Sequence, residues 1–206
     1  MADRKLTDFQ RHKRFRGYFN GMTHCRLLLL GLALLLSACR STEEAPPPAT
    51  VERVELSRYL GRWHEIARLP MPFQKEQEAA IAEYGLRPDG EVSVRNIAVR
   101  ADGATREVRG QARVLNPGAN SKLLVRFTEW FSIFVPQPEQ GNYWILHVDP
   151  EYRMALVGTP DRRYLWVLAR EPVLPEAKLQ RLLQLARDQG YDTQGLIRSA
   201  QHKPRE

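Results

Sequence analysis

The sequence contains only two cysteines, Cys25 and Cys39, and both lie ahead of the part that we expect to fold. The folded part can therefore form no internal disulfide and no cysteine-based metal site, so its stability must come from a hydrophobic core. The longest apolar run, residues 27–36, has ten residues without a charge, about half of the ~20 that a transmembrane helix requires. A glycine-rich phosphate loop and a nucleophile elbow are also missing, which argues against two common kinds of catalytic site.

The positive charge of the chain is concentrated at its beginning. The formal net charge is +7, and residues 1–38 account for +5 of it, with seven Lys or Arg against two Asp. The rest of the chain is therefore nearly neutral, at +2. A nucleic-acid-binding surface requires clustered basic residues, so we predict no nucleic-acid partner.

The first 38 residues have the layout of a secretory signal, with a basic stretch, the apolar run and then small residues. The sequence Leu36-Ser-Ala-Cys39 resembles the bacterial lipobox, which implies that Cys39 is lipid-modified and becomes the first residue of the mature protein. Arg40 follows the cysteine, and by the same resemblance favours sorting to the periplasmic side of the outer membrane. The alternative is an ordinary signal peptide in which Cys39 is incidental.

Three domain regions are predicted: 1–38 as basic region and signal peptide, 39–52 as lipidated tether, and 53–201 as folded domain. Three consecutive prolines, 46–48, and the lack of apolar periodicity indicate that the tether is semi-extended. The sequence leaves open whether translation starts at Met1 or Met22.

The folded domain reads as a series of short strands of period two, separated by turn residues about every ten positions. We predict strands at 63–69, 79–86, 91–98, 105–114, 121–128, 142–149, 152–158 and 163–170. Short turns such as Arg87-Pro-Asp-Gly90 join consecutive strands. The fold class is therefore all-β, an eight-stranded antiparallel up-and-down barrel, which removes open sheet edges and leaves an interior for one small ligand.

One amphipathic helix of about fifteen residues is predicted after the last strand. Pro175 suits its start and Gly190 its end. Leucines and an alanine recur at helical spacing, at positions 179, 182, 183 and 186, so this stripe should pack on the outside of the barrel.

Three segments of the folded domain contain recognisable motifs. The first is 61–70, with a Gly-x-Trp motif; the second is 147–156, with an Asp-x-x-Tyr turn; the third is 161–170, which ends in arginine. Together they resemble the lipocalin family, specifically its bacterial outer-membrane lipoprotein branch, which is similar to apolipoprotein D and plant temperature-induced lipocalins. The resemblance implies structural roles for the motif residues Gly61, Trp63, Asp149, Tyr152 and Arg170. It also predicts that the Arg170 guanidinium lies on the Trp63 indole, a cation–π contact.

Strand alternation predicts which side chains share the barrel interior. Tyr143, Ile145 and His147 should face inward together, as should Tyr84, Phe127 and Trp166 on other strands. These six residues form the candidate ligand-binding set. Tyr143 and Trp166 are the first candidates for ligand contact, because the resemblance implies that these two positions touch a bound acyl chain or its head group.

The sequence therefore predicts a non-catalytic, lipid-anchored lipocalin that binds and stores or carries fatty acids or lysophospholipids for outer-membrane maintenance or stress. We predict no cofactor, no metal and no catalytic residue; His64 and Glu65 are neighbours on a strand and should point to opposite faces. The alternative is a protein-interaction module with a filled barrel. The sequence leaves a homodimer open.

Overall fold

The computed structural model describes residues 45–72, 74–128 and 137–201. The chain divides into two compact units, Met1–Ala45 and Pro46–Glu206, and the fold below is that of the second unit. The predicted signal peptide and Cys39 lie outside the described residues. Among the residues described, no helix has the length and apolar character needed to span a bilayer.

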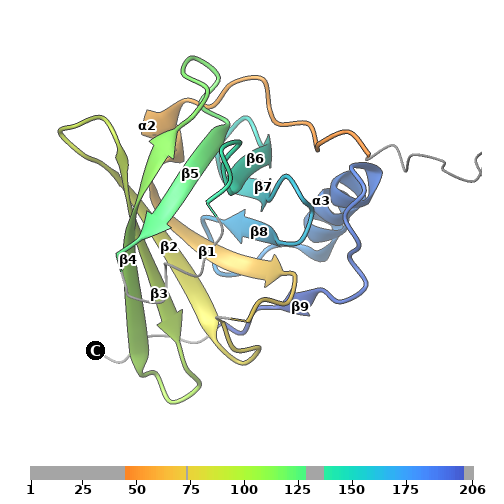
Figure 1. Cartoon of the computed structure of the whole chain (residues 1–206). Helices are drawn as coiled ribbons and strands as arrows, with labels where there is room; N and C mark the ends of the chain where they lie inside the picture. The colour runs from red at the N-terminus through yellow and green to blue at the C-terminus, as the bar shows by residue number, and fades with distance from the viewer. Residues whose placement is uncertain (1–44, 73, 129–136, 202–206) are drawn as a thin grey trace, which may run out of the picture. The chain divides into compact units, whose positions relative to one another are not determined.

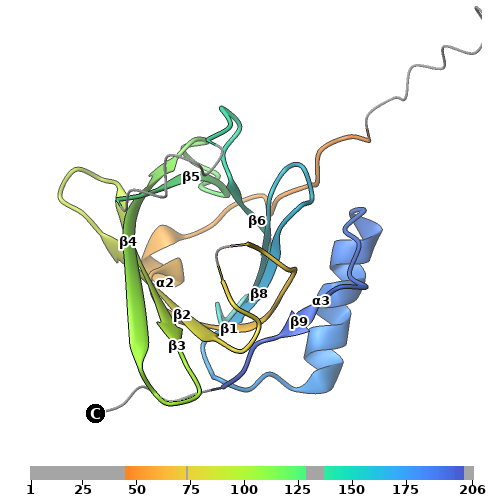
Figure 2. The same cartoon turned by 60° about the horizontal axis from the view of Figure 1, so that its bottom comes forward.

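Eight antiparallel strands follow one another around a closed barrel, as predicted (Figure 1). They are β1 (Gly61–Arg68), β2 (Ala79–Leu86), β3 (Val92–Val99), β4 (Thr105–Val114), β5 (Lys122–Phe127), β6 (Tyr143–Val148), β7 (Met154–Gly158) and β8 (Leu165–Ala169). Each strand pairs with the next, and β1 pairs with both β2 and β8, which closes the ring seen in Figure 2. Closure leaves few unpaired backbone groups at a sheet edge.

The two ends of the barrel differ. The short helix α2 (Leu56–Tyr59) leads directly into β1 and lies at one end, which we call the closed end. At the other end, the mouth, the connection 69–78 between β1 and β2 begins beside the β7–β8 turn, since the Leu69 amide donates to the Leu165 carbonyl at 3.0 Å. The β3–β4 turn at 100–104 also lies at the mouth.

The segment before α2 lies on the barrel. The Val51 amide donates to the Ile145 carbonyl at 3.0 Å, and the Val54 amide to the Ala119 carbonyl at 2.7 Å. Pro48 is buried, and Arg162 of the β7–β8 turn donates to the Pro46 carbonyl. Residues 46–52 of the predicted tether therefore have fixed contacts with the folded domain.

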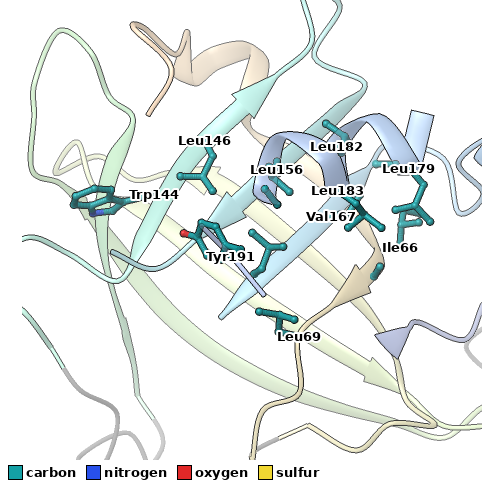
Figure 3. Packing of buried hydrophobic residues seen from close by; sticks show 14 residues of the cluster. Ile66, Leu69, Trp144, Leu146, Leu156, Val167, Leu179, Leu182, Leu183 and Tyr191 are labelled. Carbon is teal, nitrogen blue, oxygen red and sulfur yellow. The ribbon is translucent and has the colours of Figure 1, made fainter. Parts of the chain in front are cut away.

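Helix α3 (Glu176–Asp188) packs outside the barrel, as its apolar stripe predicts. Its four stripe residues are buried against outward-facing side chains of β1, β6, β7 and β8 (Figure 3). Burial of a leucine or valine side chain contributes about 1.5–3 kcal/mol, so this cluster is a second core beside the barrel interior. Its labelled members in Figure 3 include Ile66, Leu146, Leu156, Val167, Leu179, Leu182, Leu183 and Tyr191.

A ninth strand, β9 (Ile197–Arg198), was not predicted from the sequence. It pairs antiparallel with Ala67 and Arg68 at the end of β1. Arg198 also forms two hydrogen bonds with Glu176 at the start of α3, at 2.6 and 2.7 Å. A strand of two residues is too short to show a period in the sequence.

Candidate ligand-binding site

Five of the six predicted ligand-binding residues belong to one apolar cluster inside the barrel. They are Tyr84, Phe127, Tyr143, Ile145 and Trp166. The strand register explains this, because Tyr84 lies opposite Val94, Phe127 opposite Gly110, and Ile145 opposite Val157, so these pairs share the inner face. Ile145 is fully buried, whereas the other four are partly exposed. The inner face is thus apolar at these five positions, with aromatic side chains on four of the strands.

His147 does not share that face. A β-bulge between Ile145 and His147 shifts the register of β6, so that His147 lies opposite Leu156. Leu156 belongs to the outer cluster under α3, and the expectation that His147 faces inward with Ile145 is wrong. A bulge adds one residue to a strand and breaks simple alternation. Partial burial lowers the pKa of His147, and nearby Asp149 opposes that shift.

The closed end is built around Trp63 and Arg170. Trp63 is fully buried, and its indole N–H donates to the Tyr59 carbonyl at 2.7 Å. The Arg170 guanidinium lies over the indole, with 3.8 Å from its carbon to the ring centre. Arg170 also donates to five carbonyl oxygens at 2.7–3.2 Å, those of Arg58, Tyr59, Leu60, Arg62 and Tyr152. These contacts tie α2, β1 and the β6–β7 turn to the end of β8.

Gly61 lies beside Arg170 in a backbone conformation that favours glycine. Its φ is +93°, and a Cβ atom at this position would lie 3.4 Å from a terminal nitrogen of Arg170. A side chain here would be strained by the positive φ of the backbone. The backbone conformation at position 61 therefore explains why the Gly-x-Trp motif begins with glycine.

Asp149 and Tyr152 shape the β6–β7 turn. The Asp149 carboxylate accepts hydrogen bonds from the amides of Arg153 and Met154, at 2.6 and 2.7 Å. Tyr152 has a φ of +56°, and its hydroxyl accepts from the Glu55 amide at 2.8 Å. The Asp149 carboxylate oxygen and the Tyr152 hydroxyl thus accept hydrogen bonds from backbone amides at the closed end. Neither atom is available to a ligand.

Three tyrosine hydroxyls meet inside the barrel near α2. The Tyr143 oxygen lies 2.7 Å from that of Tyr59 and 3.1 Å from that of Tyr84. Burial raises the pKa of Tyr84 to about 12 and the pKa values of Tyr59 and Tyr143 well above the ordinary value. All three groups are therefore neutral phenols at physiological pH. Sequence reasoning found Tyr84 and Tyr143 but not Tyr59, which comes from the helical turn before β1.

A cavity of about 780 Å³ opens at the mouth, between the β1–β2 connection and the β3–β4 hairpin. Charged side chains of both signs line it, namely Arg68, Lys75, Glu76, Glu78, Arg100 and Arg106. Arg106 forms an ion pair with the mostly buried Glu78 at 3.4 Å. The arrangement places polar, mixed-charge groups at the mouth and apolar groups deeper in the barrel.

The described residues hold no group of three or more His, Cys, Asp or Glu side chains that could bind a metal ion. His64 lies opposite Ile81 and Ala169 on the outer face, while Glu65 lies opposite Leu168 on the inner face. The two side chains therefore point to opposite faces, as the strand alternation predicts.

Comparison with known families identifies residues 54–201 as a lipocalin-like domain. The chain belongs to the lipocalin-like family. This is a family of binding proteins, in agreement with the expectation that the chain is not an enzyme. The family resemblance of the three sequence segments is confirmed.

Curated relatives of this lipocalin cover most of its length. It is 37% identical over 154 residues to temperature-induced lipocalin-1 of Arabidopsis thaliana, covering 73% of this chain and 81% of that protein. It is 34% identical over 166 residues to the outer membrane lipoprotein Blc of Escherichia coli K12, covering 80% and 89%. It is 35% identical over 161 residues to apolipoprotein D of Rattus norvegicus, covering 72% and 81%.

Solved structures support the fold at lower identity. Apocrustacyanin C2 superposes with a TM-score of 0.56 at 14% identity, covering 77% of this chain and 91% of that one. Insecticyanin from Manduca sexta has a TM-score of 0.53 at 20% identity, covering 76% and 85%. At these identities the likeness shows the lipocalin barrel alone.

The lipocalin interior also contains an ion pair that sequence reasoning missed. A bulge in β1 between Glu65 and Ala67 places both Glu65 and Arg68 on the inner face, opposite Leu168 and Trp166. Their side chains are almost fully buried and lie 3.2 Å apart. Simple alternation from Trp63 indicates that Glu65 faces inward, but nothing in the sequence marks the bulge that turns Arg68 inward.

Other groups surround this pair. Arg68 donates to the Lys75 carbonyl at 2.8 Å, which holds the β1–β2 connection. Glu65 accepts from the Ser199 hydroxyl at 2.5 Å and from the Gln74 amide at 3.1 Å. Burial raises the pKa of Glu65 against the opposing effects of these donors. The pair thus links β1, the connection at the mouth and the segment after β9.

Proposed function

We propose that this lipocalin binds a single-chain lipid, a fatty acid or a lysophospholipid, inside its barrel, and stores or carries it for outer-membrane maintenance or stress. The observation that supports this most directly is the apolar cluster on the inner face, to which Phe127, Tyr143, Ile145 and Trp166 belong. Apolar walls with a few polar groups are typical of small-molecule sites.

The energetics fit a reversible carrier. Burial of ten methylenes at about 0.8 kcal/mol each would supply roughly 8 kcal/mol before the costs of association and chain ordering. A net affinity in the micromolar range allows both uptake and release. The mixed charges at the mouth cavity offer partners to a polar head group that stays near solvent.

We also propose that lipid chains on Cys39 anchor the protein on the periplasmic side of the outer membrane. The support is the lipobox-like sequence before Cys39 and the relatives from Escherichia coli and Vibrio cholerae, which are named outer membrane lipoproteins. One acyl chain anchors a protein only marginally, whereas two or more give stable residence.

Both parts can be tested on the protein in its own cell envelope. The wild type should fractionate with outer membranes and the Cys39→Ser variant should not, while a Cys25→Ser control should behave as the wild type. Protein purified without added lipid should release single-chain lipids, identified by mass spectrometry of an organic extract. An unchanged distribution of Cys39→Ser contradicts the anchor, and an extract free of lipid together with failure to bind added lipid contradicts the carrier.

A second candidate is a protein-interaction module with a filled barrel. The observation that favours it is the small cavity at the closed end, about 20 Å³, since the side chains fill that part of the barrel. This candidate predicts that the protein binds no fatty acid or lysophospholipid in a saturable way.

A further inference from the structure

The segment ahead of α2, orange in Figures 1 and 2, runs along the barrel from the mouth to the closed end. At the mouth, Arg162 of the β7–β8 turn donates a hydrogen bond to the Pro46 carbonyl. The Val51 amide then donates to the Ile145 carbonyl in β6 at 3.0 Å, and the Val54 amide donates to the β4–β5 turn at the closed end. The folded domain therefore begins at the mouth, although its first strand starts at the closed end.

Further contacts hold Pro46 at this position. The Arg162 side chain that binds it also donates to the Gln189 carbonyl after α3, at 2.7 Å. Pro48 is buried, and the Thr50 hydroxyl accepts a hydrogen bond from the β4–β5 turn at 3.0 Å. The chain therefore leaves the barrel surface ahead of Pro46, beside the β7–β8 turn, and not beside α2.

The part of the chain between the proposed anchor and this exit is short. Six residues, 40–45, separate Cys39 from Pro46. The steps from Cys39 to Pro46 cover at most about 25 Å when the chain is fully extended, and a flexible chain of this length has an average end-to-end distance of about 15 Å. Strands as long as β1, tilted by about 40°, make a barrel about 20 Å tall. A relaxed tether is therefore shorter than the barrel is tall.

We propose that the mouth of the barrel faces the bilayer, and that the partner of its rim is the periplasmic lipid surface of the outer membrane. The proposal rests on the proposed lipid anchor on Cys39. Because the chain leaves the domain at the mouth, the mouth lies near the bilayer when the tether is relaxed. The closed end approaches the bilayer only when the tether is stretched back along the barrel, which lowers the entropy of the chain. A single-chain lipid then has a short path from the bilayer into the barrel.

The test places a fluorescent label at either end of the barrel in the lipidated protein. Ala101 and Glu151 are exposed, the first in the β3–β4 turn at the mouth and the second in the β6–β7 turn at the closed end. The β3–β4 turn lies across the ring of strands from the β7–β8 turn, so a label there reports the direction of the mouth rather than the distance to the tether. Each residue is replaced by cysteine in turn for labelling, because Cys25 lies in the predicted signal peptide and the lipid occupies Cys39.

The labelled proteins are reconstituted in vesicles of phosphatidylethanolamine and phosphatidylglycerol that carry a nitroxide quencher on the lipid head group. We expect quenching of the Ala101→Cys label to exceed that of the Glu151→Cys label about twofold or more, since the two ends of the barrel lie about 20 Å apart. Equal quenching of the two labels, or stronger quenching at the closed end, overturns the proposed orientation.

Two changes test whether the tether causes the orientation. Insertion of about twenty Gly and Ser residues after Ala45 makes the tether longer than the barrel is tall, and it should abolish the difference between the labels. Arg162→Gln, which frees Pro46, should reduce the difference, whereas Arg163→Gln, at the exposed neighbour in the same turn, should leave it unchanged. A difference that persists after the insertion overturns the tether as its cause.

Failure of the anchor gives a different result. If Cys39 carries no lipid, the protein does not associate with the vesicles and neither label is quenched, which overturns the anchor and the orientation together. Lipid binding inside the barrel is measured independently, by titration of the unanchored Cys39→Ser variant with palmitoyl lysophospholipid. Saturable binding by this variant, together with equal quenching of the two labels in the anchored protein, overturns the orientation and leaves the carrier function in place.

Discussion

The guanidinium carbon of Arg170 lies 3.8 Å from the ring centre of Trp63, although the two residues are separated by the whole length of the barrel sequence. The same side chain donates to five carbonyl oxygens of α2, β1 and the β6–β7 turn. The Arg170 guanidinium thus joins the start of β1, the end of β8 and the helix α2 at the closed end.

Replacement of Arg170 by methionine should lower the free energy of unfolding by about 3 kcal/mol or more. The change removes the cation–π contact, worth about 0.5–2 kcal/mol, and leaves carbonyl oxygens unpaired, at about 1–3 kcal/mol for a buried one. Urea unfolding measures the effect. The control is Arg153→Met, which loses only an exposed ion pair with Glu171 and should cost under about 1 kcal/mol; equal losses for the two variants contradict the role of Arg170.

The buried residues Glu65 and Arg68 should stabilise the protein together, so that removal of either one alone lowers the free energy of unfolding strongly. Loss of one partner leaves an uncompensated buried charge, at about 3–5 kcal/mol, whereas replacement of both by apolar residues is often close to neutral. We therefore expect Glu65→Met and Arg68→Met each to destabilise the protein strongly, and the double variant to recover most of the loss. Additive losses in urea unfolding would show that the two side chains act independently.

The strand order was predictable because period two persists through most of the barrel, as in β2, whose predicted and observed bounds coincide at 79–86. The wrong direction of His147 and the missed inward direction of Arg68 have the same kind of physical cause. Bulges in β1 and β6 each insert one residue, which turns Arg68 inward and His147 outward. A bulge changes the direction of side chains without changing residue types, so alternation alone does not reveal it.

Tyr143→Phe should destabilise the barrel more than Tyr59→Phe or Tyr84→Phe. Loss of the central hydroxyl leaves two buried hydroxyls without a partner, at about 1–3 kcal/mol each, whereas loss of an outer one leaves the remaining pair bonded and costs about 0.5–1.5 kcal/mol. Thermal or urea unfolding of the three single variants gives the order. A smaller loss for Tyr143→Phe than for either outer tyrosine would show that Tyr143 is not the centre of the network.

Arg198→Gln should raise the pKa of Glu176. Hydrogen bonds from Arg198 and then Gln180 hold the pKa of Glu176 at about 2, below its ordinary 4.5. Because the pKa of Glu176 is lower in the folded state, the ionised carboxylate stabilises the fold above about pH 4.5. This stabilisation is lost as the pH falls toward about 2. The free energy of unfolding of Arg198→Gln should therefore fall less than that of the wild type over this pH range.

Carboxyl NMR titration measures the Glu176 value directly. Arg181→Gln, a change at a neighbouring exposed arginine of the same helix, is the control and should leave the pKa near 2. A wild-type value near 4.5 would mean that β9 is not held to α3 by this pair.

The parts of the fold that the sequence did not predict are the ones held by long-range contacts. β9 exists because the end of β1 has a free edge and because Arg198 reaches Glu176. Residues 46–52 contain prolines and lack a period, which is typical of a tether, yet Val51 forms a hydrogen bond with β6. In both cases the determining partner is distant in the chain, so local sequence has no signal for it.

The most direct test of the account is whether a lysophospholipid quenches or shifts the emission of Trp166 from inside the barrel. Delipidated protein is titrated with palmitoyl lysophospholipid, with Trp144→Phe as the control, since Trp144 belongs to the outer cluster under α3. We predict a saturable change in the wild type and in Trp144→Phe that is largely lost in Trp166→Phe. No saturable change in the wild type, or a change that disappears only in Trp144→Phe, would contradict a lipid inside the barrel.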